Sequence, residues 1–245
     1  MIVFCGGSDT ALRCDIDSTL DVECINMYPF QWHVQLACKL YNISHLELND
    51  KYNNFARGGV PLEEIELQLL NNVLPLLTKS KIDYLIVTLP FRHRTQLAAE
   101  YIIAPWMMLS TTNFNKSYNS FKNKLIKCNF DLSKIDESTL FSFYKNTCKF
   151  NFTYYNQLND KFLLKIESIL KYIETLGTKI FVLNSDPDEN EYLIDSKYYF
   201  KFKKIHDYID INVLNSNAPE YSNHYCLKNN QIITEKLYTE IIENN

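Results

Sequence analysis

Three short, largely apolar runs predict strands buried on both faces. They cover residues 1–5, 83–89 and 179–183, and they are followed by glycine, proline and asparagine respectively. Runs of this length and composition are typical of a parallel sheet, whose strands are covered by helices on either side. Looser alternation over 45–56 predicts a weaker strand, and a short strand is expected at 198–205.

Helical periodicity separates these runs and predicts four helices, at 29–41, 61–78, 156–176 and 228–243. Pro61, followed by Glu63 and Glu64, is a typical helix start, and Gly177 stands where a helix C-terminal glycine belongs. Strands that alternate with helices indicate an α/β protein. We therefore expect a three-layer α/β/α sandwich with a mostly parallel, flavodoxin-like sheet of about five strands.

One long stretch interrupts this alternation. Residues 105–155 are rich in Asn, Lys, Ser, Phe and Tyr, and they are too many for an ordinary connection. We interpret them as an inserted, partly helical subdomain or lid within a single domain spanning 1–245. The aromatic side chains there are expected to form the core of that subdomain.

Composition restricts the classes of function. Apolar residues make up 46% of the chain and the net charge is −4, which suits a globular protein and argues against nucleic acid as a partner. The 7 cysteines form no Cys-X-X-Cys pair, so neither a zinc site nor another metal site is predicted. No signal peptide or membrane-length apolar run is evident, so we expect a protein of the cytoplasm (the host's, if viral) or of a virion, without membrane contact.

Candidate residues for a reactive site follow the predicted strands, at what should be one edge of a parallel sheet. The first strand leads into Gly6, Gly7 and Ser8. The later candidates are Asn54 and Gly59, Thr88 and Arg92, and His224 just before the last helix. A serine becomes a nucleophile when a base such as histidine takes its proton, and loop N–H groups are common donors to the resulting oxyanion.

These motifs resemble those of the SGNH (GDSL-type) hydrolases, in the divergent form common in bacteriophage genomes. The similarity covers most of the chain in short blocks: the turn at 6–8, the segments 28–32 and 36–40, Asn54 with Ala56 and Gly59, Thr88 with Arg92, and His224 with the helix after it. The resemblance implies the fold expected above and a serine esterase or acetylesterase. Its substrate would be a small-molecule or glycan ester, and no cofactor is implied.

The resemblance also assigns roles to residues of this chain. Ser8 corresponds to the nucleophile, His224 to the base and Gly59 to an oxyanion donor. The family's Gly-X-Asn-Asp block has no counterpart after Val87, so Thr88 is the positional substitute for its asparagine. The family's aspartate before the histidine is Tyr221 here, and Glu220 is the nearest acid. Arg92 and Asn54 are candidates for contact with the substrate.

Two other interpretations remain open at this point. Asp15, Asp17 and Thr19 are similar to the Asp-X-Asp-X-Thr signature of haloacid dehalogenase-type phosphatases, which use Mg²⁺. Alternatively, the chain is a non-catalytic member of the SGNH fold that serves as a binding module or a virion component, with virion or homo-oligomer contacts. A fold by itself does not decide between these functions.

Overall fold

The structure is a computed structural model. It describes residues 1–7, 29, 31–57, 60–90, 95–98, 101–103, 118–119, 121–123, 125–126, 131–184, 202–210 and 227–243.

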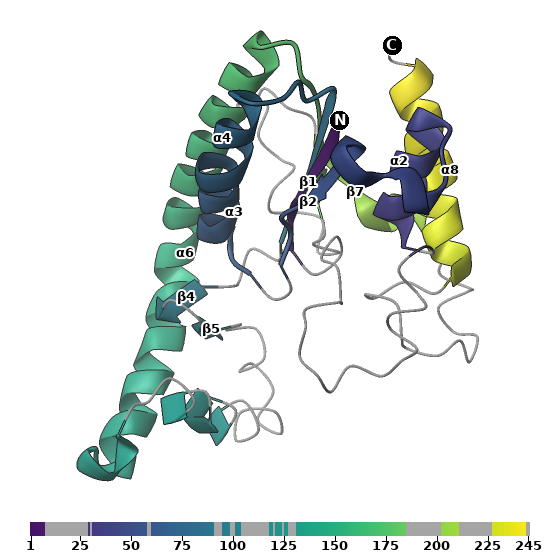
Figure 1. Ribbon diagram of the computed structural model, residues 1–245. Coiled ribbons are helices and arrows are strands. Elements are labelled where there is room, and N and C mark those ends of the chain that lie inside the picture. The colour runs from purple at the N-terminus through teal and green to yellow at the C-terminus, as the bar shows by residue number, and fades with distance from the viewer. Residues whose placement is uncertain are drawn as a thin grey trace.

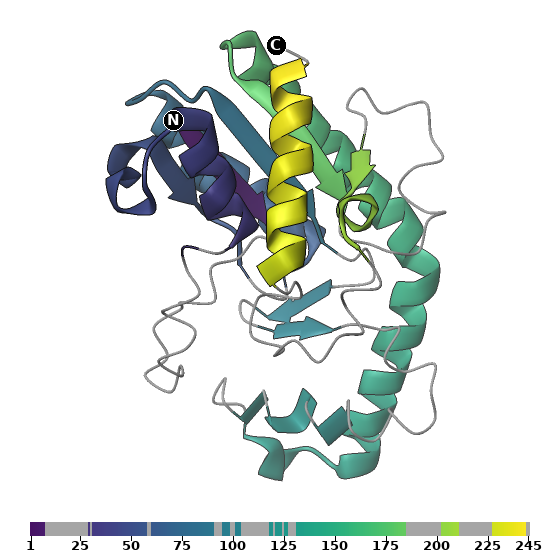
Figure 2. The same ribbon diagram turned by 90° about the vertical axis from the view of Figure 1, so that its right-hand side faces the viewer.

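The centre of the molecule is a five-stranded sheet in which every neighbouring pair of strands is parallel (Figures 1 and 2). In spatial order its strands are β2 (Tyr52–Asn54), β1 (Ile2–Gly6), β3 (Tyr84–Leu89), β6 (Lys179–Asn184) and β7 (Phe202–Lys204). Numbered along the chain, this order is 2-1-3-4-5, as in flavodoxin-like doubly wound proteins. The predicted α/β class is confirmed.

Helices lie against both faces of this sheet (Figure 1). One face carries α3 (Leu62–Gln68), a π-helical turn η4 (Leu69–Val73), α4 (Leu74–Leu77) and α6 (Glu137–Thr175). The other face carries α2 (Trp32–Tyr41) and α8 (Leu227–Glu243). Successive side chains of a strand point to opposite faces, and β1 is buried along its whole length as a result.

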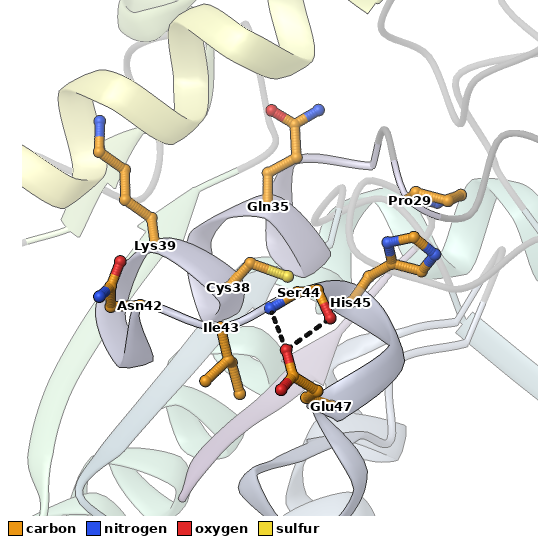
Figure 3. Close-up of a pocket in the computed structure, with 9 residues that line it drawn as sticks. All are labelled: Pro29, Gln35, Cys38, Lys39, Asn42, Ile43, Ser44, His45 and Glu47. Carbon is orange, nitrogen blue, oxygen red and sulfur yellow. Dashed lines mark hydrogen bonds between the residues drawn. The ribbon is translucent and has the colours of Figure 1, made fainter.

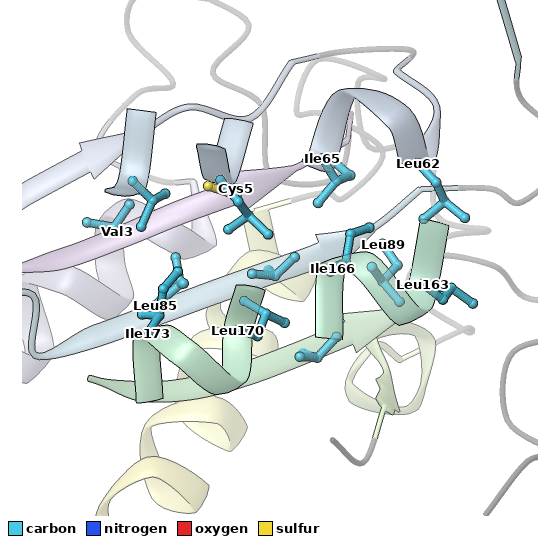
Figure 4. Close-up of a cluster of buried hydrophobic side chains, with 14 of the residues drawn as sticks. Val3, Cys5, Leu62, Ile65, Leu85, Leu89, Leu163, Ile166, Leu170 and Ile173 are labelled. Atoms are coloured by element: carbon cyan, nitrogen blue, oxygen red, sulfur yellow. The ribbon is translucent and has the colours of Figure 1, made fainter. Parts of the chain in front are cut away.

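Each face has its own hydrophobic core. Val3 and Cys5 of β1 pack with the α3 and α6 side, where Ile65 and Ile166 contribute (Figure 4). Phe4 belongs to the opposite core; the buried members of that cluster are Ile2, Phe4, Trp32, Val34, Leu36, Ala37, Leu48, Ile86, Leu183, Ile205, Tyr208, Ile233, Leu237 and Ile241. Burial on both faces explains why β1 appears in the sequence as an unbroken apolar run.

The prediction for α6 was wrong at its N-terminal end. A helix was expected over 156–176, but α6 begins at Glu137, where the Asp136 carboxylate caps it by accepting the Thr139 N–H at 3.0 Å. The predicted insertion boundary at residue 155 therefore falls inside a continuous helix. Gly177, with φ of 87°, follows the helix end as predicted.

The first turns of α6 carry a small separate core away from the sheet (Figure 2). Its buried members are Tyr118, Phe121, Leu140 and Tyr144, and Phe141 packs against them. Tyr118 and Phe141 meet edge to face with their ring centres 5.1 Å apart. In contrast, the side chain of Phe143, another of the aromatic residues expected in this core, is 53% exposed.

The remaining elements are short. The weak strand expected over 45–56 is confined to β2, because two 3-10 turns, η2 (His45–Glu47) and η3 (Asn49–Lys51), precede it. Two further 3-10 turns are η6 (Leu132–Lys134) and η7 (Ile205–Tyr208). An antiparallel pair, β4 (Thr95–Ala98) and β5 (Tyr101–Ile103), was not anticipated. Among the helices described, none has both the length and the apolar character that a membrane crossing requires.

Candidate functional site

Two of the seven candidate residues, Asn54 and Thr88, lie within the described part of the structure. The other five are outside it: Ser8, Gly59, Arg92, Glu220 and His224. The aspartates of the phosphatase interpretation, Asp15 and Asp17, are also outside the described residues. The described strand ends that lead to these residues therefore define the geometry of a site at this sheet edge.

The strand ends meet at one edge of the sheet, as the sequence predicted. Gly6, the last residue of β1, is in register with Thr88 of β3, and Phe4 is in register with Asn54 of β2. Strand order reverses at β1 and β3, and ligands of open α/β sheets bind outside the carboxyl ends at such a point. Gly6 thus lies at the position in this fold where a site is expected.

Gly6 adopts a conformation that strongly favours glycine. Its φ is +151°, and a Cβ placed on it would stand 1.8 Å from Oγ1 and 2.7 Å from the carbonyl oxygen of Thr88. A Cβ on Gly7 would contact Cβ of Pro90 at 3.2 Å. The chain therefore leaves β1 pressed closely against the end of β3.

The loop after β2 is bonded to the same strand end. The Phe55 N–H donates to the Phe4 carbonyl at 2.8 Å, and the Arg57 N–H donates to the Gly6 carbonyl at 3.0 Å. The Asn54 side chain stabilises this loop by accepting the Ala56 N–H at 2.9 Å. Two segments that are about fifty residues apart in sequence are consequently held side by side.

Thr88 is fully buried, and its hydroxyl donates to the Cys5 carbonyl at 3.3 Å. This bond joins the ends of β3 and β1. A role for Thr88 as a donor to an oxyanion would require its hydroxyl to turn away from that carbonyl, and this role stays a prediction. The observed contact makes Thr88 part of the wall against which Gly6 packs.

Sequence reasoning missed Gln68, the last residue of α3. Its side chain is buried, and its Oε1 accepts the Gly6 N–H at 2.8 Å while its Nε2 donates to the Gly6 carbonyl at 3.3 Å. A signal was present in the sequence: Gln68 shares the buried face of its helix with Leu62 and Ile65. A polar residue on an apolar helix face needs a hydrogen-bond partner in the interior.

A second buried polar group lies on the other face of β1. His33 packs among Phe4, Trp32 and Tyr52, and the Tyr52 hydroxyl lies 2.8 Å from its Nδ1. Burial lowers the pKa of His33 to about 3, so the ring is neutral near pH 7. Its Nε2 and the Oε1 of Gln31 have no hydrogen-bond partner among the residues described. These contacts give His33 a packing role in the core between the sheet and α2.

An open pocket of about 520 Å³ lies along α2 and the turn after it (Figure 3). Its charged lining groups are engaged in contacts on the protein: Glu47 accepts from Ser44, and Lys39 pairs with Glu235. Pro29 contributes to the lining from the segment that joins β1 to α2, and the other lining residues belong to α2 and the chain that follows it. None of the seven candidate residues lines this pocket.

Among the described residues, no group of three or more His, Cys, Asp and Glu side chains is placed to hold a metal ion. Comparison with known protein families, curated proteins and solved structures finds no match for this chain.

Proposed function

We propose that this protein is a serine ester hydrolase of the SGNH type, with Ser8 as nucleophile and His224 as base. One observation carries the proposal: the 3.0 Å hydrogen bond from the Arg57 N–H to the Gly6 carbonyl. Arg57 and Gly6 each precede a proposed catalytic residue, Gly59 and Ser8, by two positions. The bond supports a site in which the nucleophile and an oxyanion donor come from adjacent segments.

The fold agrees with this proposal at a coarser level. A parallel sheet in the order 2-1-3-4-5, with helices against both faces, supports the three-layer α/β/α sandwich of SGNH hydrolases. The start of α8 supports the role of His224, which precedes its first residue, Leu227, by three positions. In the first turn of α8, the Asn229 Oδ1 accepts the Asp210 N–H at 2.8 Å, beyond the carboxyl end of β7.

In the proposed reaction, His224 takes the hydroxyl proton of Ser8 while the Ser8 oxygen attacks the acyl carbonyl of an ester. The N–H groups of Ser8 and Gly59 donate to the oxyanion that forms. The proton passes to the departing alcohol, and water, activated by the same histidine, then releases the acid from the acyl-enzyme. Glu220 is the candidate to orient His224, and Arg92 and Asn54 are candidates for substrate contact.

The test is hydrolysis of p-nitrophenyl acetate by the wild type and by Ser8→Ala, His224→Ala and Ser168→Ala. Ser168 is an exposed serine of α6 whose hydroxyl donates to the Leu164 carbonyl of the same helix, so it is the matched control. Turnover lost with Ser8 and His224 but kept in Ser168→Ala supports the proposal. Mg²⁺-dependent phosphatase activity lost in Asp15→Asn would favour the phosphatase instead. Folded wild type without any turnover would favour a binding module.

A further inference from the structure

The buried amide of Gln68 replaces a missing strand partner at the end of β1. Phe4 and Gly6 are two residues apart, so their carbonyls point toward the same side of the strand, the side of β2. There β2 ends at Asn54, and among the described residues just beyond it the Arg57 N–H is the backbone donor to the Gly6 carbonyl. Gln68 donates a second bond to the Gly6 carbonyl and accepts from the Gly6 N–H.

Gly6 is enclosed on its other side as well. Thr88 stands so close that a Cβ on Gly6 would lie 1.8 Å from its Oγ1 and 2.7 Å from its carbonyl oxygen. The backbone of Gly6 is thus bonded to Gln68 and Arg57 on one side and lies against Thr88 on the other. These contacts hold the end of β1, from which the chain continues to Ser8.

The helix that carries Gln68 is irregular at this residue. The π-helical turn Leu69–Val73 begins directly after it, and such turns are rare and frequently occur at functional sites. Leu69 and Val73 remain buried in the core despite the wider turn. The irregular turn is thus compatible with full packing, and it coincides with the residue that holds Gly6.

From these contacts we infer that Gln68 is a positioning residue for the nucleophile. It fixes the backbone of Gly6 and thereby the place from which Ser8 acts, an inference that rests on the proposed function. Gln68 is bonded to the backbone of β1, two residues before Ser8, and so acts through that backbone. Nucleophilic attack depends on placement within a fraction of an ångström, and a misplacement of about 1 Å can cost on the order of a hundredfold in rate.

The first test compares Gln68→Met with Val73→Ala. Methionine has nearly the shape of glutamine but neither hydrogen-bonding atom, whereas Val73→Ala removes volume from the same core and leaves the amide of Gln68 in place. For p-nitrophenyl acetate we expect kcat of Gln68→Met to fall by about ten- to a hundredfold with KM little changed. Val73→Ala should keep kcat within about twofold. Equal kcat values in the two variants would overturn the inference.

Gln68→Glu provides a second readout, which a merely structural role would not produce. A protonated carboxyl group can accept from the Gly6 N–H and donate to the Gly6 carbonyl, as the amide does, but a carboxylate lacks the donor. Burial favours the protonated form. We therefore expect the ratio of variant to wild-type kcat to be highest at low pH and to fall as pH rises. A ratio that is independent of pH between about 5 and 9 would count against the inference.

These measurements separate the two proposals. If the wild type hydrolyses the ester through Ser8 and Gln68→Met retains its kcat, the inference on Gln68 fails alone. If the wild type does not hydrolyse the ester at all, the proposed function fails and the positioning role fails with it. If Gln68→Met does not fold, the pH dependence of Gln68→Glu decides.

Discussion

Replacing Gly6 by alanine tests the geometry at the end of β1 most sharply. The new Cβ would stand 1.8 Å from Oγ1, 2.9 Å from Cβ and 2.7 Å from the carbonyl oxygen of Thr88. Rotation of the threonine side chain relieves only the first of these contacts. Because the backbone oxygen belongs to the central strand β3, at least one of the two strands must move.

The expected cost has two parts. The φ of +151° is unfavourable for a residue with a Cβ, by about 1–3 kcal/mol. Overpacking a rigid interior adds about 1–3 kcal/mol. We therefore expect Gly6→Ala to lower the free energy of unfolding by about 2–6 kcal/mol, a large share of the stability of an ordinary domain.

Urea unfolding, followed by circular dichroism, measures this loss. Gly177→Ala is the matched control, because Gly177 also has a positive φ, of +87°, but no atom lies within 4 Å of the site of its Cβ. It should lose only about 1–2 kcal/mol, the backbone cost alone. In a Thr88→Ala background, Gly6→Ala should cost less than in the wild type but should still be destabilising, since the carbonyl oxygen remains. A Gly6→Ala protein as stable as Gly177→Ala would refute the described packing of Gly6 against Thr88.

Three further predictions concern other buried groups. Because the folded-state pKa of His33, about 3, lies below the ordinary value of 6.5, the unfolded chain binds a proton that the folded chain excludes. The free energy of unfolding should fall as the pH drops from 6.5 toward about 3, by up to about 1.4 kcal/mol per pH unit. Urea titrations near pH 5 and pH 7 would measure this fall, which should be smaller in a His33→Phe/Tyr52→Phe protein. Cys5 is fully buried and burial raises the pKa of its thiol, so iodoacetamide should modify its peptide only in urea; modification in the native protein would contradict this. The Oδ1 of Asn230 accepts the buried backbone N–H of Trp32 at 2.9 Å. Asn230→Ala removes this acceptor and should lower the free energy of unfolding by about 1–3 kcal/mol in the same assay; an unchanged midpoint would contradict this.

The sheet could be predicted from the sequence because strands that are buried on both faces are almost entirely apolar. The runs at 1–5, 83–89 and 179–183 became β1, β3 and β6, the three adjacent central strands. Covered on both faces, such strands have apolar residues at nearly every position. The edge strand β2 has only three residues, all partly buried, so its mark in the sequence is weak.

The length of α6 could not be predicted because its two halves pack differently. Ile166 and Ile173 contact the sheet and give a regular apolar stripe. The first turns pack Leu140 and Tyr144 against Tyr118 and Phe121 in a separate cluster, so that stripe does not continue toward Glu137. The capping residue Asp136 was the available signal for the true start.

For the candidate site, the sequence predicted which strand ends meet but not how they are held. Thr88 and Asn54 lie on the strands that flank β1, as expected from a parallel sheet. The bonds from Gln68 to Gly6 join residues 62 positions apart, and no local pattern specifies such a contact. Tertiary geometry was needed to recognise the role of that glutamine.

The central claim is that Ser8 is a nucleophile, and covalent labelling tests it most directly. The wild type and Ser8→Ala would be treated with a fluorophosphonate, which phosphonylates activated serines with loss of fluoride, and each peptide would then be analysed by mass spectrometry. We predict one adduct per chain, on Ser8, and no adduct in Ser8→Ala. A folded wild type that remains unlabelled, or is labelled at another serine, would contradict the account.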